Sequence, residues 1–221
     1  MLLGFQLTYT QIADMGPAGF AAVAGILVAT FVFIKWVGRL LGVAPALTEL
    51  IAVGTAVCGA SAVIATNTVT RGSDEDVAYA IACVTVFGSI AMLALPVLAP
   101  LWGIGGGAFG WWAGASIHEV AQVTAATFQG GLEATQSGTV AKLSRVVLLA
   151  PLILALAALE RRRGHAGSAE APPMPWFVLG FLAVVAVNSV WPVTGIAKDV
   201  IVTITTLMLT IALAAMGLET D

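Results

Sequence analysis

Two ionisable side chains stand next to each other inside an apolar stretch of this sequence. His118 and Glu119 lie within residues 108–128, which contain no Lys, Arg or Asp. A histidine titrates near neutral pH, and a neighbouring carboxylate can share or tune its proton. Gln122 lies one helical turn beyond His118 and extends the polar face. We interpret His118 and Glu119 as a proton-coupling pair; the alternative is a structural hydrogen bond at a segment end.

Small residues mark a second pattern that could bind an anion. The triplets Gly59-Ala60-Ser61 and Gly114-Ala115-Ser116 lie in the middle of two apolar stretches. A helix broken at such a point exposes backbone N–H groups and a positive helix end, which favour anions. Close packing is the alternative, because Gly106, Gly110 and Gly114 are spaced four apart. Ser61 and Ser116 could equally bond back to their own helices.

Lys142 and Arg145 are spaced to share one helical face and could attract an anion, although both could also extend to a membrane interface. The remaining polar candidates, Glu49, Asn188, Lys198 and Asp199, are interpreted as segment-end or packing residues. The predicted substrate-binding residues are Gly59, Ala60, Ser61, Asn67, Gly114, Ser116, Gln122, Lys142 and Arg145.

Enzyme motifs fail on inspection. The run from His118 to Gln122 lacks the second histidine of a zinc-protease helix. The glycines at 103–107 stand between apolar segments rather than after a strand, so they do not form a dinucleotide fingerprint. No Walker loop is present, and a Ser116–His118 pair has no third group to orient the base. We therefore predict no catalytic residue, no metal and no cofactor.

The elements that position these residues are expected to cross a membrane. The 221 residues are 59% hydrophobic and 10% charged, against about 25% charged in a typical soluble domain. Several windows reach the roughly 20 apolar residues that span a bilayer. The net charge of -3 and the lack of a basic patch argue against nucleic acid. Cys58 and Cys83 fall in apolar segments and are interpreted as inert hydrophobes. The predicted class is an all-α membrane protein.

Seven membrane segments are predicted, and two of them are expected to be broken or re-entrant. Their approximate limits are 17–41, 46–69, 77–102, 108–128, 139–159, 176–190 and 196–216. The second and fourth contain the Gly-Ala-Ser triplets. A polar linker at 161–175 is expected to be a cytoplasmic loop, since basic residues favour that side. If every segment spans, Lys35 and Arg39 are also cytoplasmic, whereas Arg71 and the acidic run at 74–76 are external; one re-entrant segment would invert part of this.

Three motifs together resemble the YeiH-like family (UPF0324) of bacterial inner-membrane proteins, whose members are described as candidate sulfate exporters. They are GTAVCGASA at 54–62, GASIHEVAQV at 114–123 and KLSRVVLLAP at 142–151. PWFVLGF at 175–181, Asn188-Ser189 and residues 214–218 add support. The resemblance covers essentially the whole chain and implies an inverted-repeat transporter fold in the inner membrane.

The family pattern continues at both ends, with helices before Met1 and after Asp221, so residues 1–221 are expected to be one transmembrane transporter domain and a fragment of the family fold. The resemblance implies a secondary transporter that exports sulfate or sulfite. From the residue types we hypothesise that His118 and Glu119 couple proton movement to this export. The expected partners are the lipid bilayer and a small anion, with homo-oligomerisation left open. A non-transporting structural or regulatory subunit is the alternative from another class; an ion channel and an intramembrane hydrolase rank lower.

Overall fold

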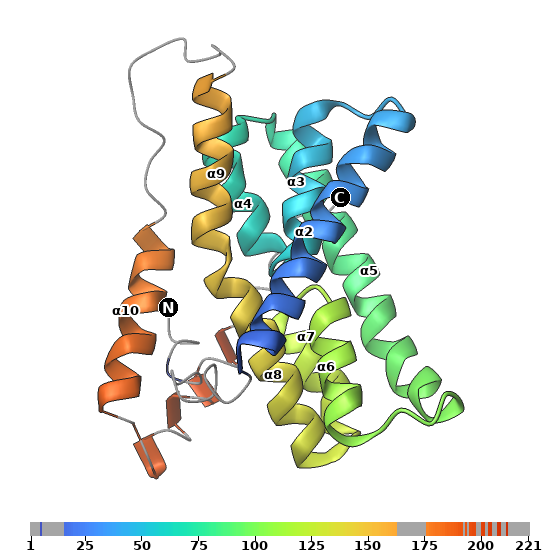
Figure 1. Cartoon of the computed structure of the whole chain (residues 1–221), viewed down its shortest axis with the longest axis vertical. Helices are drawn as coiled ribbons and strands as arrows, with labels where there is room; N and C mark the ends of the chain where they lie inside the picture. Colours follow the sequence, from blue (N-terminus) through green and yellow to red (C-terminus); the bar gives the residue numbers. More distant parts are fainter. Residues whose placement is uncertain are drawn as a thin grey trace. The chain divides into compact units, whose positions relative to one another are not determined.

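The computed structural model describes residues 5, 16–162, 176–191, 193, 195–197, 200–201, 203–204, 207–208 and 211. Every regular element in these ranges is a helix, as predicted (Figure 1). The helices are α2 (Gly16–Leu40), α3 (Pro45–Ala56), α4 (Ala60–Thr70), α5 (Asp74–Leu101), α6 (Gly106–Ser116), α7 (Val120–Phe128), α8 (Gly131–Val147), α9 (Leu149–Arg162) and α10 (Trp176–Val190). The chain divides into two compact units: Met1–Ala21 with Trp176–Asp221, and Ala22–Pro175.

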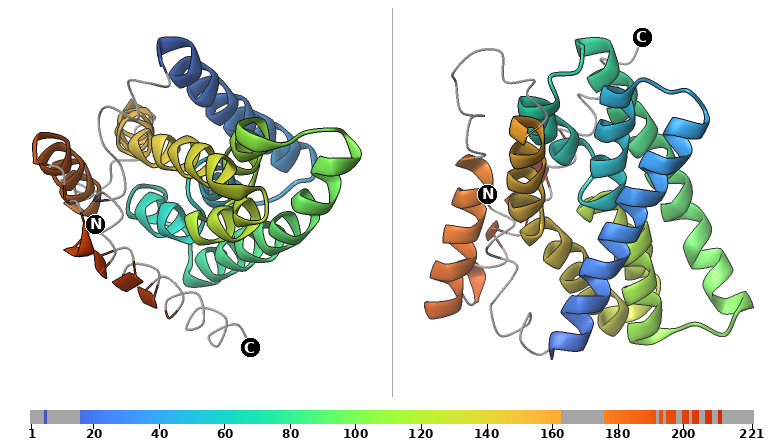
Figure 2. Two further views of the ribbon diagram at one scale, coloured as in Figure 1. Left: turned by 90° about the horizontal axis from the view of Figure 1, so that it is seen from below. Right: turned by 45° about the horizontal axis from the view of Figure 1, so that its top comes forward.

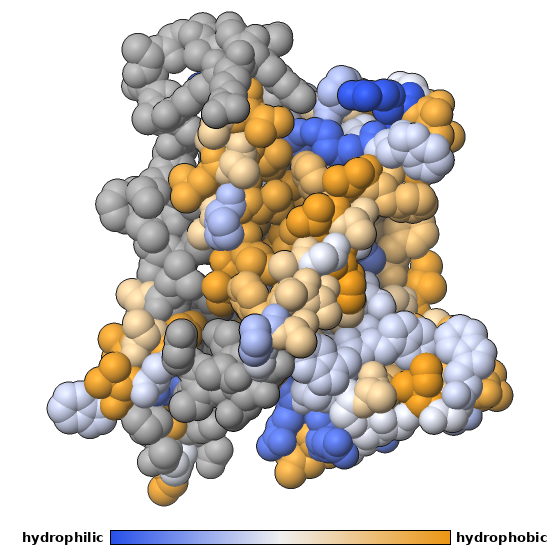
Figure 3. All heavy atoms as spheres, in the orientation of Figure 1, coloured by the Kyte–Doolittle hydropathy of each residue, from blue (hydrophilic) through white to orange (hydrophobic). Residues whose placement is uncertain are grey.

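Three helical stretches are long and apolar enough to cross a membrane. They are Gly16–Leu40, Asp74–Leu101 and Gly131–Leu159, the last formed by α8 and most of α9. Large apolar side chains such as Phe33, Phe87 and Leu93 are exposed on the outward faces of α2 and α5, and hydrophobic residues dominate the surface along α2 in Figure 3. Exposed apolar faces of this kind are suited to lipid.

Two further segments are re-entrant hairpins. The hydroxyl of Thr70, at the end of α4, donates to Glu49 Oε1 near the start of α3 over 3.0 Å, so the α3–α4 hairpin returns to the end where it began. Gly130, after α7, packs against Phe109 at the start of α6, so the α6–α7 hairpin does the same. Figures 1 and 2 show the two hairpins entering the second unit from opposite ends. The predicted broken or re-entrant segments are confirmed, in an arrangement typical of inverted repeats.

The α3–α4 hairpin corrects the predicted sidedness of the acidic run. Helix α3 has 12 residues, which gives a length of about 18 Å, against about 30 Å for the hydrocarbon core of a bilayer. Because the segment turns back, Arg71 and residues 74–76 lie at the same end as Lys35 and Arg39, not at the opposite end. A capping box between Ser73 and Asp76 then starts α5.

The glycines of α6 serve close packing. A Cβ on Gly110 would overlap Ser137 and the Ala134 carbonyl, and one on Gly114 would lie 2.9 Å from the Ala141 Cβ. Helix α6 therefore lies directly against α8, which confirms the packing interpretation of this four-residue spacing. The close contact brings the interior face of α8 next to the end of α6.

The first unit contains α10. Within it, Asn188 is buried, donates to the Phe5 carbonyl over 3.1 Å and accepts from the Val193 N–H over 3.1 Å. This fits the prediction that Asn188 is a packing residue. Lys198, Asp199, residues 163–175 and much of the seventh predicted segment lie outside the described residues.

Candidate functional site

The tips of the two hairpins meet inside the second unit. Helix α3 ends at Ala56 and α4 begins at Ala60, while α6 ends at Ser116 and α7 begins at Val120. Each break therefore comprises three residues, 57–59 and 117–119. Helix ends leave backbone groups unpaired and carry partial charges, positive at N-termini and negative at C-termini. Two ends of each sign thus face the same interior region, which we call the tip centre: Cys58, Gly59, His118, Glu119, Lys142 and Arg145.

The first break depends on Gly59. Its φ of 76° and ψ of -136° place it in a region that is essentially restricted to glycine. A Cβ at this position would also lie 2.7 Å from Glu119 Cγ, so the second break packs directly on the first. Beside it, Cys58 Sγ lies 3.2 Å from Ser61 Oγ. The predicted helix break at the first Gly-Ala-Ser triplet is therefore present.

Glu119 lies at the N-termini of α4 and α7, the second helix of each hairpin. It begins α7 in a reciprocal capping box with Gln122, in which the Glu119 N–H donates to Gln122 Oε1 over 3.3 Å. Its carboxylate also faces the Ala60 N–H at the start of α4. Oε1 has no hydrogen-bond partner among the described residues, and the residue is only 8% exposed. A buried acid therefore lies where two positive helix ends converge.

Lys142 and Arg145 serve the opposite helix ends. Both are fully buried on α8, so they do not extend to an interface. Lys142 Nζ donates to the Ile117 carbonyl over 2.6 Å. Arg145 donates to the carbonyls of Thr55 and Ala56 on α3, the latter over 2.7 Å, and to that of Ala115 on α6. The two cations thus neutralise the negative C-terminal ends of α3 and α6.

His118 lies between these charges. It is 8% exposed, and its Nδ1 has no hydrogen-bond partner among the described residues. Lys142 and Arg145 are close enough to interact with it electrostatically. Buried polar atoms are nearly always paired, so the unpaired atoms on the consecutive residues His118 and Glu119 make this pair a candidate site.

The structure assigns other positions to several predicted site residues. Asn67 lies near the end of α4, where its Oδ1 accepts from the Gly72 N–H over 2.7 Å. Gln122 links α7 to α5 through the Thr85 carbonyl and Ser89 Oγ, at 3.3 and 3.2 Å. Gly114 packs on α8. Asn67 and Gly114 are therefore not brought together with the buried charges, whereas Gln122 contacts Glu119 through the capping box.

Ser61 and Ser116 flank the breaks but are exposed rather than buried. No hydrogen bond joins Ser116 to His118 in the described part of the chain, so the nucleophile and base of a hydrolase are not assembled. Cys58, which was interpreted as an inert hydrophobe, is a free buried cysteine in the first break.

Comparison with known proteins agrees with the predicted resemblance. The family model described as conserved hypothetical protein 698 matches residues 1–221. A UPF0324 membrane protein of Pseudomonas aeruginosa is 38% identical, with 100% of this chain and 65% of the relative covered. The UPF0324 inner membrane proteins YeiH of Salmonella typhi and Escherichia coli are 36% and 35% identical, each with 100% of this chain and 64% of the relative covered. The chain thus spans 64–65% of the length of these relatives.

No solved structure matches the chain. The family match over the full chain, the all-helical fold and the apolar spans agree with one another. The chain therefore belongs to the UPF0324 family of multi-pass bacterial inner-membrane proteins, to which YeiH belongs.

Proposed function

We propose that this protein is a secondary transporter that exports a small inorganic oxyanion, sulfate or sulfite, through the tip centre. The observation that carries the proposal is the Glu119 carboxylate, buried at the N-termini of α4 and α7 with one oxygen unpaired. Ionisable groups at membrane depth are costly and commonly functional. Broken helices that meet at such a depth are the usual substrate site of inverted-repeat transporters.

Glu119 occupies the position that suits a substrate anion. Backbone N–H groups at a helix N-terminus bind anions, and the first N–H of α4, that of Ala60, faces this carboxylate. In this proposal an oxyanion replaces the carboxylate at the same N–H groups. Ser61 and Ser116, exposed beside the two breaks, supply hydroxyl donors on the approach. Resident carboxylate and substrate therefore compete for one pair of helix ends.

This competition provides a route to proton coupling. Protonation of Glu119 removes its charge and its preference for the helix ends, so the oxyanion gains access. His118, the next residue, takes and returns the proton. The charged and titratable groups that act on this pair are Lys142, Arg145 and Cys58. Lys142 and Arg145 are committed to helix carbonyls, which keeps the negative ends of α3 and α6 from repelling the anion.

The test is flux of sulfite and sulfate in proteoliposomes that contain the full-length protein, with and without a pH gradient. In the wild-type protein we expect flux that follows the pH gradient. In Glu119→Gln the flux should no longer respond to the gradient, and in His118→Ala the gradient-driven flux should be lost. Glu133→Gln is the matched control, because Glu133 is an exposed acid outside the tip centre. Unchanged gradient dependence in both tip variants would refute the coupling, and no flux of either anion through folded protein would remove the substrate assignment.

A further inference from the structure

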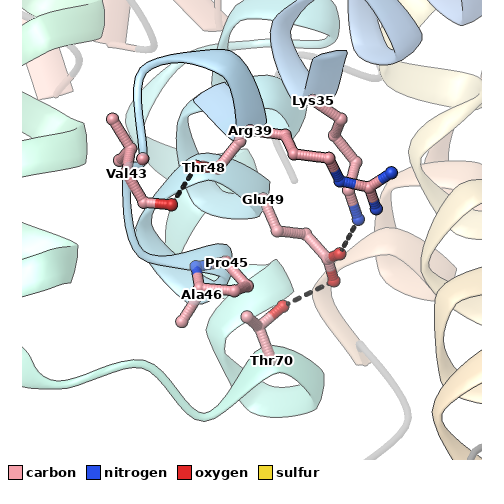
Figure 4. Close-up of a pocket in the computed structure, with 9 residues that line it drawn as sticks. Lys35, Arg39, Val43, Pro45, Ala46, Thr48, Glu49 and Thr70 are labelled. Atoms are coloured by element: carbon pink, nitrogen blue, oxygen red, sulfur yellow. Dashed lines mark hydrogen bonds and ion pairs between the residues drawn. The ribbon is translucent and has the colours of Figure 1, made fainter. Parts of the chain in front are cut away.

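A pocket lies at the end of the second unit where α2 finishes and the α3–α4 hairpin begins and returns. Its volume is about 440 Å³, within the range of roughly 300–1,000 Å³ typical of ligand pockets. Lys35, Arg39, Thr48, Glu49 and Thr70 are among the residues that line it (Figure 4). Gly38 packs tightly on Thr48, which fixes the end of α2 against α3 and gives the pocket a firm wall.

The pocket carries one positive charge in excess. Glu49 is buried, and both of its oxygens are engaged: Oε2 by Lys35 Nζ and Oε1 by the Thr70 hydroxyl. The ammonium of Lys35 is held further by the Phe31 ring, whose centroid is 5.3 Å away. Figure 4 shows the Arg39 guanidinium beside this ion pair, on the same side of the pocket. One carboxylate therefore faces two cations, and Arg39 is left to attract an anion.

The surroundings of the pocket are suited to lipid. Trp36, Leu40 and Leu41, on the last turn of α2 and just beyond it, are 59%, 66% and 73% exposed. Tryptophan is enriched where membranes meet water, at the depth of the lipid head groups. An apolar rim beside an arginine offers one surface to acyl chains and another to the phosphate that they carry.

The distribution of basic residues assigns this end to the cytoplasm. Arg71 lies here, and Figure 1 shows the end of α9, with Arg161 and Arg162, at the same end as the ends of α2 and α4. Residues 72–141, which run from the start of α5 through the α6–α7 hairpin at the opposite end and into α8, contain no Lys or Arg. Because basic residues favour the cytoplasmic side, the pocket faces the leaflet whose anionic lipids attract such clusters.

We propose that this pocket binds the phosphate of an anionic phospholipid, with Arg39 as its cation. A guanidinium presents paired donors that match phosphate oxygens. The Lys35–Glu49 pair forms a neutral floor, so the single charge of Arg39 matches the single charge of a phosphodiester. The proposal does not depend on the transported substrate. A free oxyanion has the same chemistry, and the experiment separates the two sources.

The test compares phosphatidylglycerol with phosphatidylcholine, and with inorganic phosphate and sulfate, as ligands of the purified full-length protein measured by native mass spectrometry. We expect retention of phosphatidylglycerol over phosphatidylcholine, reduced roughly fivefold in Arg39→Gln. Arg71→Gln is the matched control, because Arg71 is a basic residue at the same end that does not line the pocket.

Glu49→Gln supplies a variant with the opposite sign. Removing the carboxylate releases Lys35 and gives the pocket a second free cation, so we expect tighter phosphatidylglycerol binding, which misfolding could not produce. Equal loss in Arg39→Gln and Arg71→Gln would show attraction to the whole basic end and overturn the pocket. Binding of free phosphate or sulfate without preference for phosphatidylglycerol would also overturn it, in favour of an entry site for the substrate.

Discussion

The two hairpin breaks have the same length but differ in backbone conformation and in the side chains that they contribute. Residues 57–59 turn the chain with a glycine and contribute no side chain to cap α4. Residues 117–119 are extended and contribute Glu119, which caps α7 and also faces the start of α4. One carboxylate therefore serves two helix N-termini. The two breaks therefore differ in backbone conformation, and the carboxylate comes from the second hairpin alone.

The C-termini of α3 and α6 likewise share one side chain, Arg145. Arg145 binds carbonyls at the end of α3 and at the end of α6, so one guanidinium joins both hairpins, and Lys142 adds a bond to the second break only. Arg145 and Glu119 thus each contact both hairpins, whereas Lys142 contacts one. Displacement of either hairpin would therefore break contacts of the other, which is the coupling that the proposed transport would require.

Removal of Arg145 is expected to have the largest effect, because it affects both breaks. Arg145→Met leaves carbonyls of both α3 and α6 without their donor, and we expect a loss of about 3–5 kcal/mol in the free energy of unfolding. Arg145→Lys keeps the positive charge but loses the several N–H donors of the guanidinium. Its stability is expected to lie between those of wild type and Arg145→Met. Thermal unfolding in detergent measures both, with the exposed Arg71→Gln as control. An Arg145→Met protein as stable as that control would mean that the hairpins do not depend on the hydrogen bonds from Arg145 to the ends of α3 and α6.

A substitution at Gly59 changes the first break alone. Gly59→Ala forces a side chain into a glycine-only conformation, at a cost of about 1–3 kcal/mol, and pushes the new Cβ against Glu119. We expect lower thermal stability and loss of proton-coupled flux together. Gly25→Ala is the control, since Gly25 has an ordinary helical φ and nothing within 4 Å of a Cβ. If Gly59→Ala matched that control, the two breaks would not depend on direct contact.

Lys142 provides the corresponding test of the second break. Lys142→Met removes one bond to the Ile117 carbonyl and leaves the α3 end intact. We expect a loss of about 1–3 kcal/mol in stability, which is the cost of one unpaired buried group, and a larger relative loss of flux. The measurement is flux normalised to folded protein. Equal losses of stability in Lys142→Met and Arg145→Met would show that the hydrogen bonds from Arg145 to the end of α3 do not contribute to stability.

The sequence predicted the elements better than their paths. Length, hydropathy and the two Gly-Ala-Ser triplets indicated the membrane class and the positions of both breaks. They left open whether these two broken segments cross the membrane or return to the end where they began, because apolar content measures how long a segment is and not where its far end lies. The contact that decides this, Thr70 with Glu49, joins residues 21 apart in sequence.

The sequence also indicated which charges are buried but not their partners. His118, Glu119, Lys142 and Arg145 were recognised from their position in apolar segments. Lys142 and Arg145 were interpreted as groups that either attract an anion or extend to an interface. They are buried and bind backbone carbonyls, which a sequence does not display. Polar residues outside the breaks, such as Asn67, carried the same pattern of type and context without the same role.

Asn67 yields the smallest expected effect and marks the limit of the tip centre. Its side chain accepts from the Gly72 N–H, where α4 ends and Arg71 adopts a left-handed conformation. Asn67→Ala is expected to lower stability by about 0.5–1.5 kcal/mol, the net contribution of one hydrogen bond. Anion affinity and the response of flux to a pH gradient should match wild type, since the lost bond lies at the far end of α4 from Gly59. A changed anion affinity in this variant, measured by isothermal titration, would extend the binding site along α4 and return Asn67 to the role that the sequence first indicated.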